Sequence, residues 1–195
     1  IRLNRSLVLS PTGSGKSFII YLIIRFLLDH VQGKILISVP SINLVRQMHT
    51  DFCSYEDNRF ICDQCYELLA GASKSTSRRV IIATWAMLLR QEENWFNQFD
   101  VLIVDEAHQA DSMALGKIIN RMTHVAYRFG FTGTLDGSKV HELQCRAWFG
   151  TLIKSSSTKD LMDRGVLSEL EVISHSLAYS DSDRAFVKDA DYPEE

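Results

Sequence analysis

A run of small and polar residues near the start of the chain, residues 10–17, has the composition of a phosphate-binding loop. Gly13 and Gly15 carry no Cβ, so the backbone N–H groups beside them can approach phosphate oxygens. The apolar residues after the loop predict a helix, whose N-terminus adds partial positive charge at the same point. Lys16 would then reach the β- and γ-phosphates of a nucleoside triphosphate, and the Ser17 hydroxyl would bind Mg²⁺.

The loop departs at one position from the general pattern G-x-x-x-x-G-K-[ST], which has glycine where this chain has Ser10. An ordinary glycine turn before a helix is therefore the alternative for the loop taken alone. On the first interpretation, the nucleotide contacts come from seven consecutive residues: Pro11, Thr12, Gly13, Ser14, Gly15, Lys16 and Ser17.

A second motif, Asp-Glu-Ala-His at residues 105–108, directly follows the apolar run 101–104. Two adjacent acids at the end of a buried strand are unfavourable unless a cation meets them. Asp105 would hold Mg²⁺, and Glu106 would orient and deprotonate the attacking water. The alternative is that the two acids only cap the next helix. The phosphate-binding loop upstream favours the catalytic interpretation.

Both motifs need a strand in front of them, and short apolar runs alternate with helical patterns along the chain. Buried strands are predicted at residues 7–9, 34–39, 80–83, 101–104 and 127–131, with a further short strand at about 66–69. Helices are predicted at residues 18–28, from 41, from 85 and near 115–122. The alternation predicts an α/β fold, with a parallel sheet covered by helices on both faces. Ligands of such sheets bind at the carboxyl ends of the strands, where both motifs lie.

The composition is that of an ordinary globular domain. The 195 residues are 46% hydrophobic and 23% charged, and the net charge of −3 gives no global sign of a nucleic-acid-binding protein. A local basic patch is still compatible with that sum. No apolar run reaches the roughly 18 residues that span a bilayer, so no membrane association is expected.

The four cysteines are expected to be reduced thiols, because no secretory signal is recognised at the start of the sequence. Zinc binding is the alternative, since one histidine and three cysteines lie close in sequence: His49, Cys53, Cys62 and Cys65. Their spacing matches no strong zinc template, which favours ordinary thiols.

The order of the motifs resembles the first RecA-like domain of superfamily 2 helicases and nucleic-acid translocases. Residues 10–17 resemble motif I of that family, and residues 105–108 resemble motif II. Weaker motifs fall in the expected places at residues 39–41 with Leu44 and Gln47, residues 70–74, residues 83–85 and residues 131–134. Residues 95–100 and 129–135 are similar to phage recombination and branch-migration DNA helicases of the UvsW type. The similarity extends from about residue 6 to residue 150.

The resemblance implies a RecA-like P-loop NTPase fold that uses ATP and Mg²⁺, with Lys16 and Glu106 as catalytic residues. ATP hydrolysis would be coupled to DNA unwinding, branch migration or translocation. The resemblance also assigns residues that contact the nucleic-acid backbone without reading its sequence: Ser41, Gly71 and Thr84. A third set would link the nucleotide state to the grip on nucleic acid: His108, Thr132 and Thr134. Taken singly, Ser41 is equally a helix N-cap and Thr84 a strand end.

Residues 1–150 are therefore predicted to form the helicase ATP-binding domain, and residues 151–195 a linker and the start of a truncated second RecA-like domain. The family needs that second domain as a partner, because its arginine finger completes the site. DNA is expected as the nucleic-acid partner more than RNA, in the cytoplasm of a bacterial or phage-infected cell. The alternatives are an RNA helicase of the same superfamily and a non-hydrolysing nucleic-acid-binding module. The intact Lys16, Asp105 and Glu106 argue against the second of these.

Overall fold

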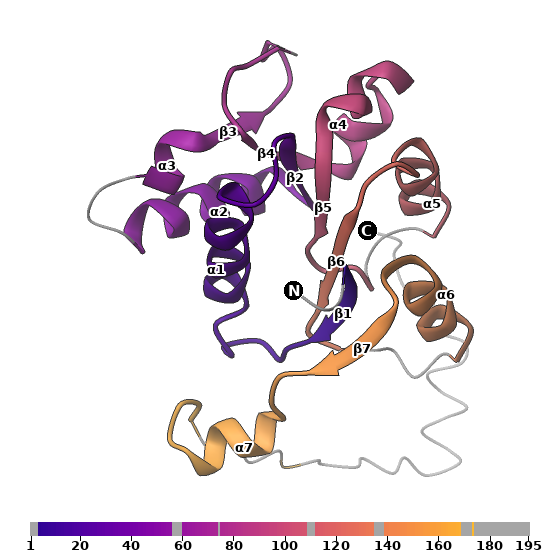
Figure 1. The fold of residues 1–195 in the computed structure, drawn as a ribbon. Helices are drawn as coiled ribbons and strands as arrows, with labels where there is room; N and C mark the ends of the chain where they lie inside the picture. The colour runs from indigo at the N-terminus through magenta and orange to yellow at the C-terminus, as the bar shows by residue number, and fades with distance from the viewer. Residues whose placement is uncertain are drawn as a thin grey trace, which may run out of the picture.

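The computed structural model describes residues 4–55, 60–73, 75–108, 112–134, 139–168 and 173. These residues form one seven-stranded sheet in the order β3-β4-β2-β5-β6-β1-β7 (Figure 1). Every strand pair in it is parallel. The strands are β1 (Arg5–Leu9), β2 (Lys34–Val39), β3 (Cys65–Leu68), β4 (Val80–Thr84), β5 (Phe99–Val104), β6 (Tyr127–Thr132) and β7 (Thr151–Lys154).

Helices cover both faces of the sheet (Figure 1). On one face lie α1 (Lys16–Leu28) and α2 (Ile42–Ser54), with α3 (Phe60–Gln64) beside α2. On the other face lie α4 (Trp85–Leu89), α5 (Ser112–Arg121) and α6 (Lys139–Phe149). A 3₁₀ helix, η1 (Glu93–Gln98), precedes β5, and α7 (Thr158–Asp163) follows β7. The predicted α/β class with helices on both faces is confirmed.

The central strands β2, β4 and β5 are nearly continuous apolar runs because both of their faces are buried. In β2, Ile35 and Ile37 pack into the core that contains α1 and α2, whereas Leu36 packs into the core on the opposite face. All three side chains have no exposed surface. The two-residue period of a strand thus fills two separate cores from one short sequence.

The connection from α1 to β2 is held by Arg79, which directly precedes β4. Its guanidinium donates to the backbone oxygens of Leu28 and Val31 at 2.8 and 2.5 Å. The Arg79 carbonyl in turn accepts a hydrogen bond from the backbone N–H of Ile35, in β2, at 2.8 Å. One side chain therefore fixes where the first helix ends relative to the central strands.

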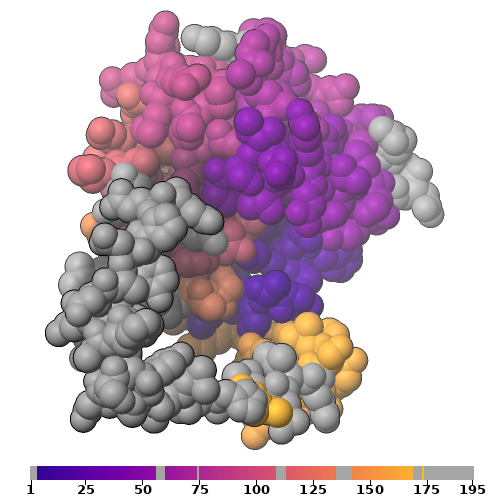
Figure 2. All heavy atoms as spheres, turned by 180° about the vertical axis from the view of Figure 1, so that it is seen from behind, coloured from indigo at the N-terminus to yellow at the C-terminus, as the bar shows by residue number. Residues whose placement is uncertain are grey.

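The strand β7 lies beyond residue 150 and pairs with β1 over Ser6–Leu9. The sheet of the first domain consequently extends to Lys154. Leu167, after α7, reaches back to the first loop, since a Cβ placed on Gly13 would lie 2.6 Å from its Cδ2. The space-filling view accordingly places the orange α7 segment beside the indigo amino-terminal segment (Figure 2). Residues 169–172 and 174–195, where a second domain is predicted to start, lie outside the described residues, so that domain stays a prediction.

The expectation of four reduced thiols is wrong for Cys53 and Cys62, which form a disulfide in this structure. The end of α2 and the start of α3 bring their Cα atoms to 4.7 Å. A separation of nine residues does not reveal this approach in the sequence. Cys65 and Cys145 are buried and not part of a disulfide.

Within the described part of the chain, every helix is too short or too polar to cross a bilayer.

Candidate nucleotide site

The loop of residues 10–17 joins β1 to α1 at the carboxyl edge of the sheet. Ser10 is fully buried, and its backbone N–H donates to the Thr132 carbonyl on β6 at 2.9 Å. Its hydroxyl lies 2.5 Å from that of Ser14, which in turn donates to the Pro11 carbonyl at 2.6 Å. The serine that departs from the general pattern therefore ties the loop to itself and to the neighbouring strand.

Two glycines give the loop its path. Gly13 and Gly15 have φ of 78° and 80°, in the left-handed region that other residues rarely enter. Gly15 is the last residue before α1, and its carbonyl accepts the Ile19 N–H at 3.0 Å. The turn thus directs the loop into a helix N-terminus, where partial positive charge favours anions.

The acidic pair sits in a turn after β5 that is held from both sides. The Asp105 N–H donates to Ser38 on β2 at 2.9 Å, and the Ala107 N–H donates to Phe131 on β6 at 2.8 Å. Glu106 has φ of 50°, and no other non-glycine residue among those described has a positive φ. Such backbone conformations are unfavourable and cluster at functional sites. The strain here turns two consecutive carboxylates toward the same loop.

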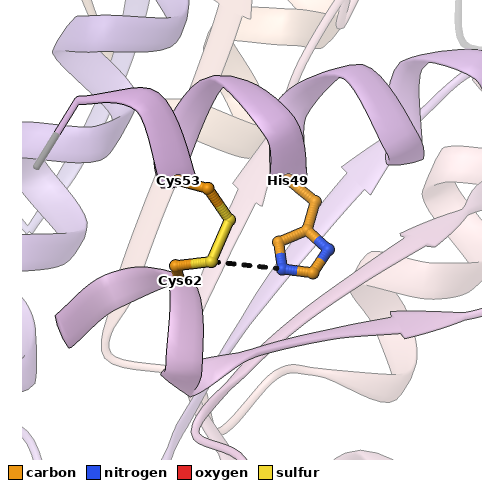
Figure 3. Close-up of side chains that lie close together, drawn as sticks. All are labelled: His49, Cys53 and Cys62. Atoms are coloured by element: carbon orange, nitrogen blue, oxygen red, sulfur yellow. Dashed lines mark hydrogen bonds between the residues drawn. A yellow bond between two sulfur atoms is a disulfide. The ribbon is translucent and has the colours of Figure 1, made fainter. Parts of the chain in front are cut away.

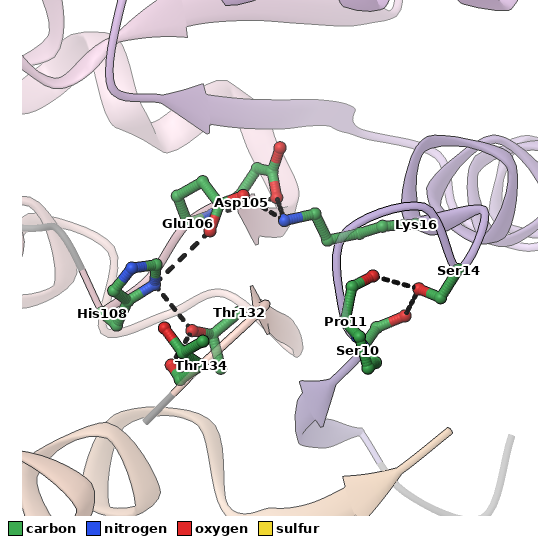
Figure 4. Close-up of polar contacts among 9 residues, drawn as sticks. All are labelled: Ser10, Pro11, Ser14, Lys16, Asp105, Glu106, His108, Thr132 and Thr134. Atoms are coloured by element: carbon green, nitrogen blue, oxygen red, sulfur yellow. Dashed lines mark hydrogen bonds and ion pairs between the residues drawn. The ribbon is translucent and has the colours of Figure 1, made fainter. Parts of the chain in front are cut away.

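Lys16 meets both acids (Figure 4). Its Nζ lies 3.2 Å from Asp105 Oδ1, and it also forms an ion pair and hydrogen bond with Glu106 Oε1. Burial raises the pKa of the Asp105 carboxyl above its usual range; the Lys16 charge opposes this shift, and the Glu106 charge adds to it. A buried carboxylate is thus kept beside a cation that can balance its charge.

His108 connects the acids to β6. Its Nδ1 lies 2.7 Å from Thr132 Oγ1 and 3.4 Å from Glu106 Oε2. Thr132 Oγ1 donates its proton to the Thr134 carbonyl at 2.6 Å, so it must accept from His108, which places a proton on Nδ1. The predicted coupling residues are therefore joined to one another by hydrogen bonds, and His108 also lies beside the Glu106 carboxylate.

A cavity of 460 Å³ adjoins these groups, lined by the loop, both acids and one face of α2. The α2 residues in it are Leu44, Gln47, Met48 and Asp51. Tyr55, at the end of α2, places its hydroxyl 2.7 Å from Ser17 Oγ. Sequence reasoning missed Asp51 and Tyr55, because nothing in their local sequence shows that α2 packs beside the loop.

The residues predicted to contact nucleic acid lie elsewhere on the same edge. Ser41 follows β2, Thr84 ends β4, and Gly71 follows β3 in a turn with φ of 80°. These three strands are neighbours in the sheet. Ser41 and Thr84 are helix N-caps, accepting from backbone N–H groups at 3.3 Å. Their nucleic-acid role stays a prediction.

The family model described as "Type III restriction enzyme, res subunit" matches residues 2–137. The chain belongs to this family. The match agrees with the resemblance to superfamily 2 helicases that the motifs carry.

One relative, the UvsW helicase of phage T4, is similar to this chain in both sequence and structure. The ATP-dependent DNA helicase uvsW of Enterobacteria phage T4 is 34% identical over 197 residues, which cover 98% of this chain and 39% of that protein. The crystal structure of the UvsW helicase from bacteriophage T4 superimposes with a TM-score of 0.68 at 32% identity, covering 77% of this chain and 54% of that one. The predicted resemblance to the UvsW type is confirmed. The chain spans about two fifths of the length of the uvsW relative.

The helicase domain of Hef from Pyrococcus furiosus has the same fold at 20% identity, with a TM-score of 0.63 over 78% of this chain and 36% of that one. The predicted RecA-like architecture is therefore confirmed.

Proposed function

We propose that this chain is the ATP-hydrolysing motor domain of a DNA helicase or translocase. The observation that carries the proposal is the pairing of Lys16 with Asp105 and Glu106 beside the glycine loop. A lysine, a metal-binding carboxylate and a carboxylate that acts as a base are among the groups that NTP hydrolysis uses. The relative at 34% identity is described as an ATP-dependent DNA helicase, which supports the same activity.

The cavity suits a nucleotide in size and chemistry. Its 460 Å³ falls within the roughly 300–1,000 Å³ of small-molecule sites. The loop would hold the phosphates through backbone N–H groups around Gly13 and Gly15. Lys16 would exchange its carboxylate partners for phosphate oxygens, which leaves the Glu106 carboxylate to take a proton from water. Nucleotide binding would in this way free the Glu106 carboxylate to act as the base.

Ser17 and Asp105 are the residues that would hold Mg²⁺. Hydroxyl and carboxylate oxygens are the ligands this ion prefers, and both residues line the same cavity. When bound, Mg²⁺ would neutralise charge that develops on the transferred phosphoryl group. The raised pKa of Asp105 also fits, because a buried carboxylate short of positive charge is a favourable cation ligand.

The nucleic-acid strand would cross the β3-β4-β2 half of the sheet edge, while the nucleotide occupies the β5-β6-β1 half. Neighbouring strands lie about 4.8 Å apart, so Ser41, Thr84 and Gly71 would follow a backbone over about 10 Å. The His108–Thr132 pair lies beside Glu106 and would couple a change in the bound nucleotide to a movement of β6. We keep a second RecA-like domain as a partner for full activity, because its arginine would stabilise the transition state. We further propose that the protein acts in the cytoplasm of a bacterial or phage-infected cell, which the phage origin of the uvsW relative supports.

The test is ATP hydrolysis by the full-length protein, with single-stranded, duplex or branched DNA and with matched RNA. We expect stimulation by DNA, and a loss of roughly 10²–10⁴-fold in Glu106→Gln with nucleotide binding retained. Glu93→Gln, the same change at an exposed position in η1, should hydrolyse at the unaltered rate. Stimulation by RNA alone would instead support the RNA helicase. Nucleotide binding without any hydrolysis would refute the motor assignment.

A further inference from the structure

A second cluster of polar side chains lies where α2 meets α3, apart from the cavity lining. It consists of His49, Cys53 and Cys62, whose ligand atoms all lie within 4.8 Å of one another (Figure 3). His49 Nε2 is 4.0 Å from Cys62 Sγ, and the two sulfurs form the disulfide. None of the nucleotide chemistry uses these groups.

The histidine is held with one nitrogen toward the sulfurs. His49 Nδ1 lies 2.7 Å from Glu67 Oε1 on β3, which leaves Nε2 directed at Cys62. A carboxylate bonded to the far nitrogen is the usual support of a metal-binding histidine, because it fixes the tautomer and the ring orientation. An isolated disulfide has no need of such a histidine.

We propose that the reduced protein binds one Zn²⁺ through His49 Nε2, Cys53 Sγ and Cys62 Sγ. Two thiolates balance the charge of the ion, and the soft sulfur ligands with imidazole suit zinc. With Zn–S near 2.3 Å and Zn–N near 2.0 Å, ligand atoms around a tetrahedral ion lie about 3.5–3.8 Å apart. The 4.0 Å between His49 Nε2 and Cys62 Sγ is close to that spacing, and Cys53 Sγ lies within 4.8 Å of the same nitrogen, so the main change needed is to part the two sulfurs.

The disulfide and the metal exclude each other. Two molecules of glutathione open the disulfide, giving two cysteine thiols and one molecule of oxidised glutathione. Zn²⁺ then displaces the two thiol protons, and oxidised glutathione reverses the exchange and releases the ion. The proposed cytoplasmic location, where thiols stay reduced, favours the metal-bound form.

Zinc at this position would fix the last turn of α2 to α3. The same helix lines the nucleotide cavity with Gln47 and Asp51, and it ends at Tyr55, which contacts Ser17. The proposed zinc site and the proposed phosphate site therefore share helix α2.

The experiment compares the reduced and the oxidised full-length protein after equilibration with Zn²⁺ and removal of unbound metal. We expect one zinc more per chain in the reduced protein, released when oxidised glutathione is added. Co²⁺ in place of Zn²⁺ should give thiolate-to-metal charge-transfer absorption in the reduced form alone. This comparison needs no substitution, so it does not depend on a variant that folds.

Variants then locate the ligands. Cys53→Ser and Cys62→Ser should each lose that zinc, and Cys145→Ser, at a buried cysteine on α6, should retain it. Glu67→Gln should weaken zinc affinity by roughly 10–100-fold. Equal zinc in the reduced and oxidised forms, or zinc retained in the doubly substituted Cys53→Ser/Cys62→Ser protein, would overturn the proposal. ATP hydrolysis does not enter these readouts, so they stand apart from the proposed motor function.

Discussion

Replacing Lys16 by methionine should destabilise the protein even without nucleotide, because two carboxylates then lose their counter-charge. The Lys16 and Asp105 side chains are only 14% and 8% exposed, so they form a buried pair. At 3.2 Å and an effective dielectric constant of about 20, their attraction is about 5 kcal/mol before desolvation. Breaking a buried pair on one side costs about 3–5 kcal/mol. For a domain of this size the melting temperature should fall by about 6–20 °C.

The loss should depend on pH in a definite direction. The folded-state pKa of Asp105 already lies above its usual value, so the folded protein holds that proton more tightly than the unfolded chain does. Stability is therefore lost as the pH rises from the usual pKa of an aspartate to the folded-state pKa of Asp105. Removing Lys16 raises that folded-state pKa further. Lys16→Met should be more destabilised at about pH 8 than at about pH 5, because protonation of Asp105 becomes more favourable as the pH falls.

Urea unfolding at both pH values measures the effect. Lys117→Met, the same change at an exposed position of α5, should shift the free energy of unfolding by less than about 0.5 kcal/mol. Adding Asp105→Asn to Lys16→Met should restore part of the loss, because it removes the orphaned charge. A Lys16→Met protein as stable as the parent, or equally destabilised at both pH values, would refute the electrostatic account.

Three further predictions each concern a single contact in the structure. Gly130→Ala should cost about 1–3 kcal/mol, since the new Cβ would lie 2.7 Å from the buried Phe149 ring; an unchanged melting temperature would contradict this packing. Arg79→Met should lose about 1–3 kcal/mol by leaving backbone carbonyls without their donor, a loss that urea unfolding would reveal and that a surface role would not produce. Tyr55→Phe should tighten Mg²⁺-dependent nucleotide binding by roughly 2–13-fold, because Ser17 no longer gives up a hydrogen bond worth about 0.5–1.5 kcal/mol; titration calorimetry that shows no change would exclude this competition.

The central strands and the catalytic groups could be predicted from the sequence because their signals are local. Residues 80–83 and 101–104 are uninterrupted apolar runs, residues 35–39 are apolar except for Ser38, and each segment lies in a buried strand. Asp105 directly follows one of them, so its place at the carboxyl edge needs only the fold class. The position of Lys16 could be predicted in the same way, because it directly follows the glycine loop.

Features that depend on distant pairing could not be predicted. The strand β7 is mostly exposed and lacks an apolar run, and it becomes a strand by pairing with β1. The Tyr55–Ser17 hydrogen bond and the Cys53–Cys62 disulfide both depend on how α2 packs against its neighbours. The sequence pattern shows that α2 exists but not what its far end touches.

The place of β1 in the sheet bears on how the protein is made on the ribosome. β1 is synthesised before the other strands of the described chain, whereas both of its partners, β6 and β7, are the last two of these strands. Lys16 precedes Glu106 by 90 residues, so at about 5–20 residues per second the loop emerges roughly 5–18 s before its carboxylate. The nascent chain can assemble β2, β4 and β5 in that interval, while the apolar β1 stays without a neighbour. The proposed nucleotide site can thus form only in a chain whose translation has passed β6, and until then β1 is an apolar strand without its sheet partners.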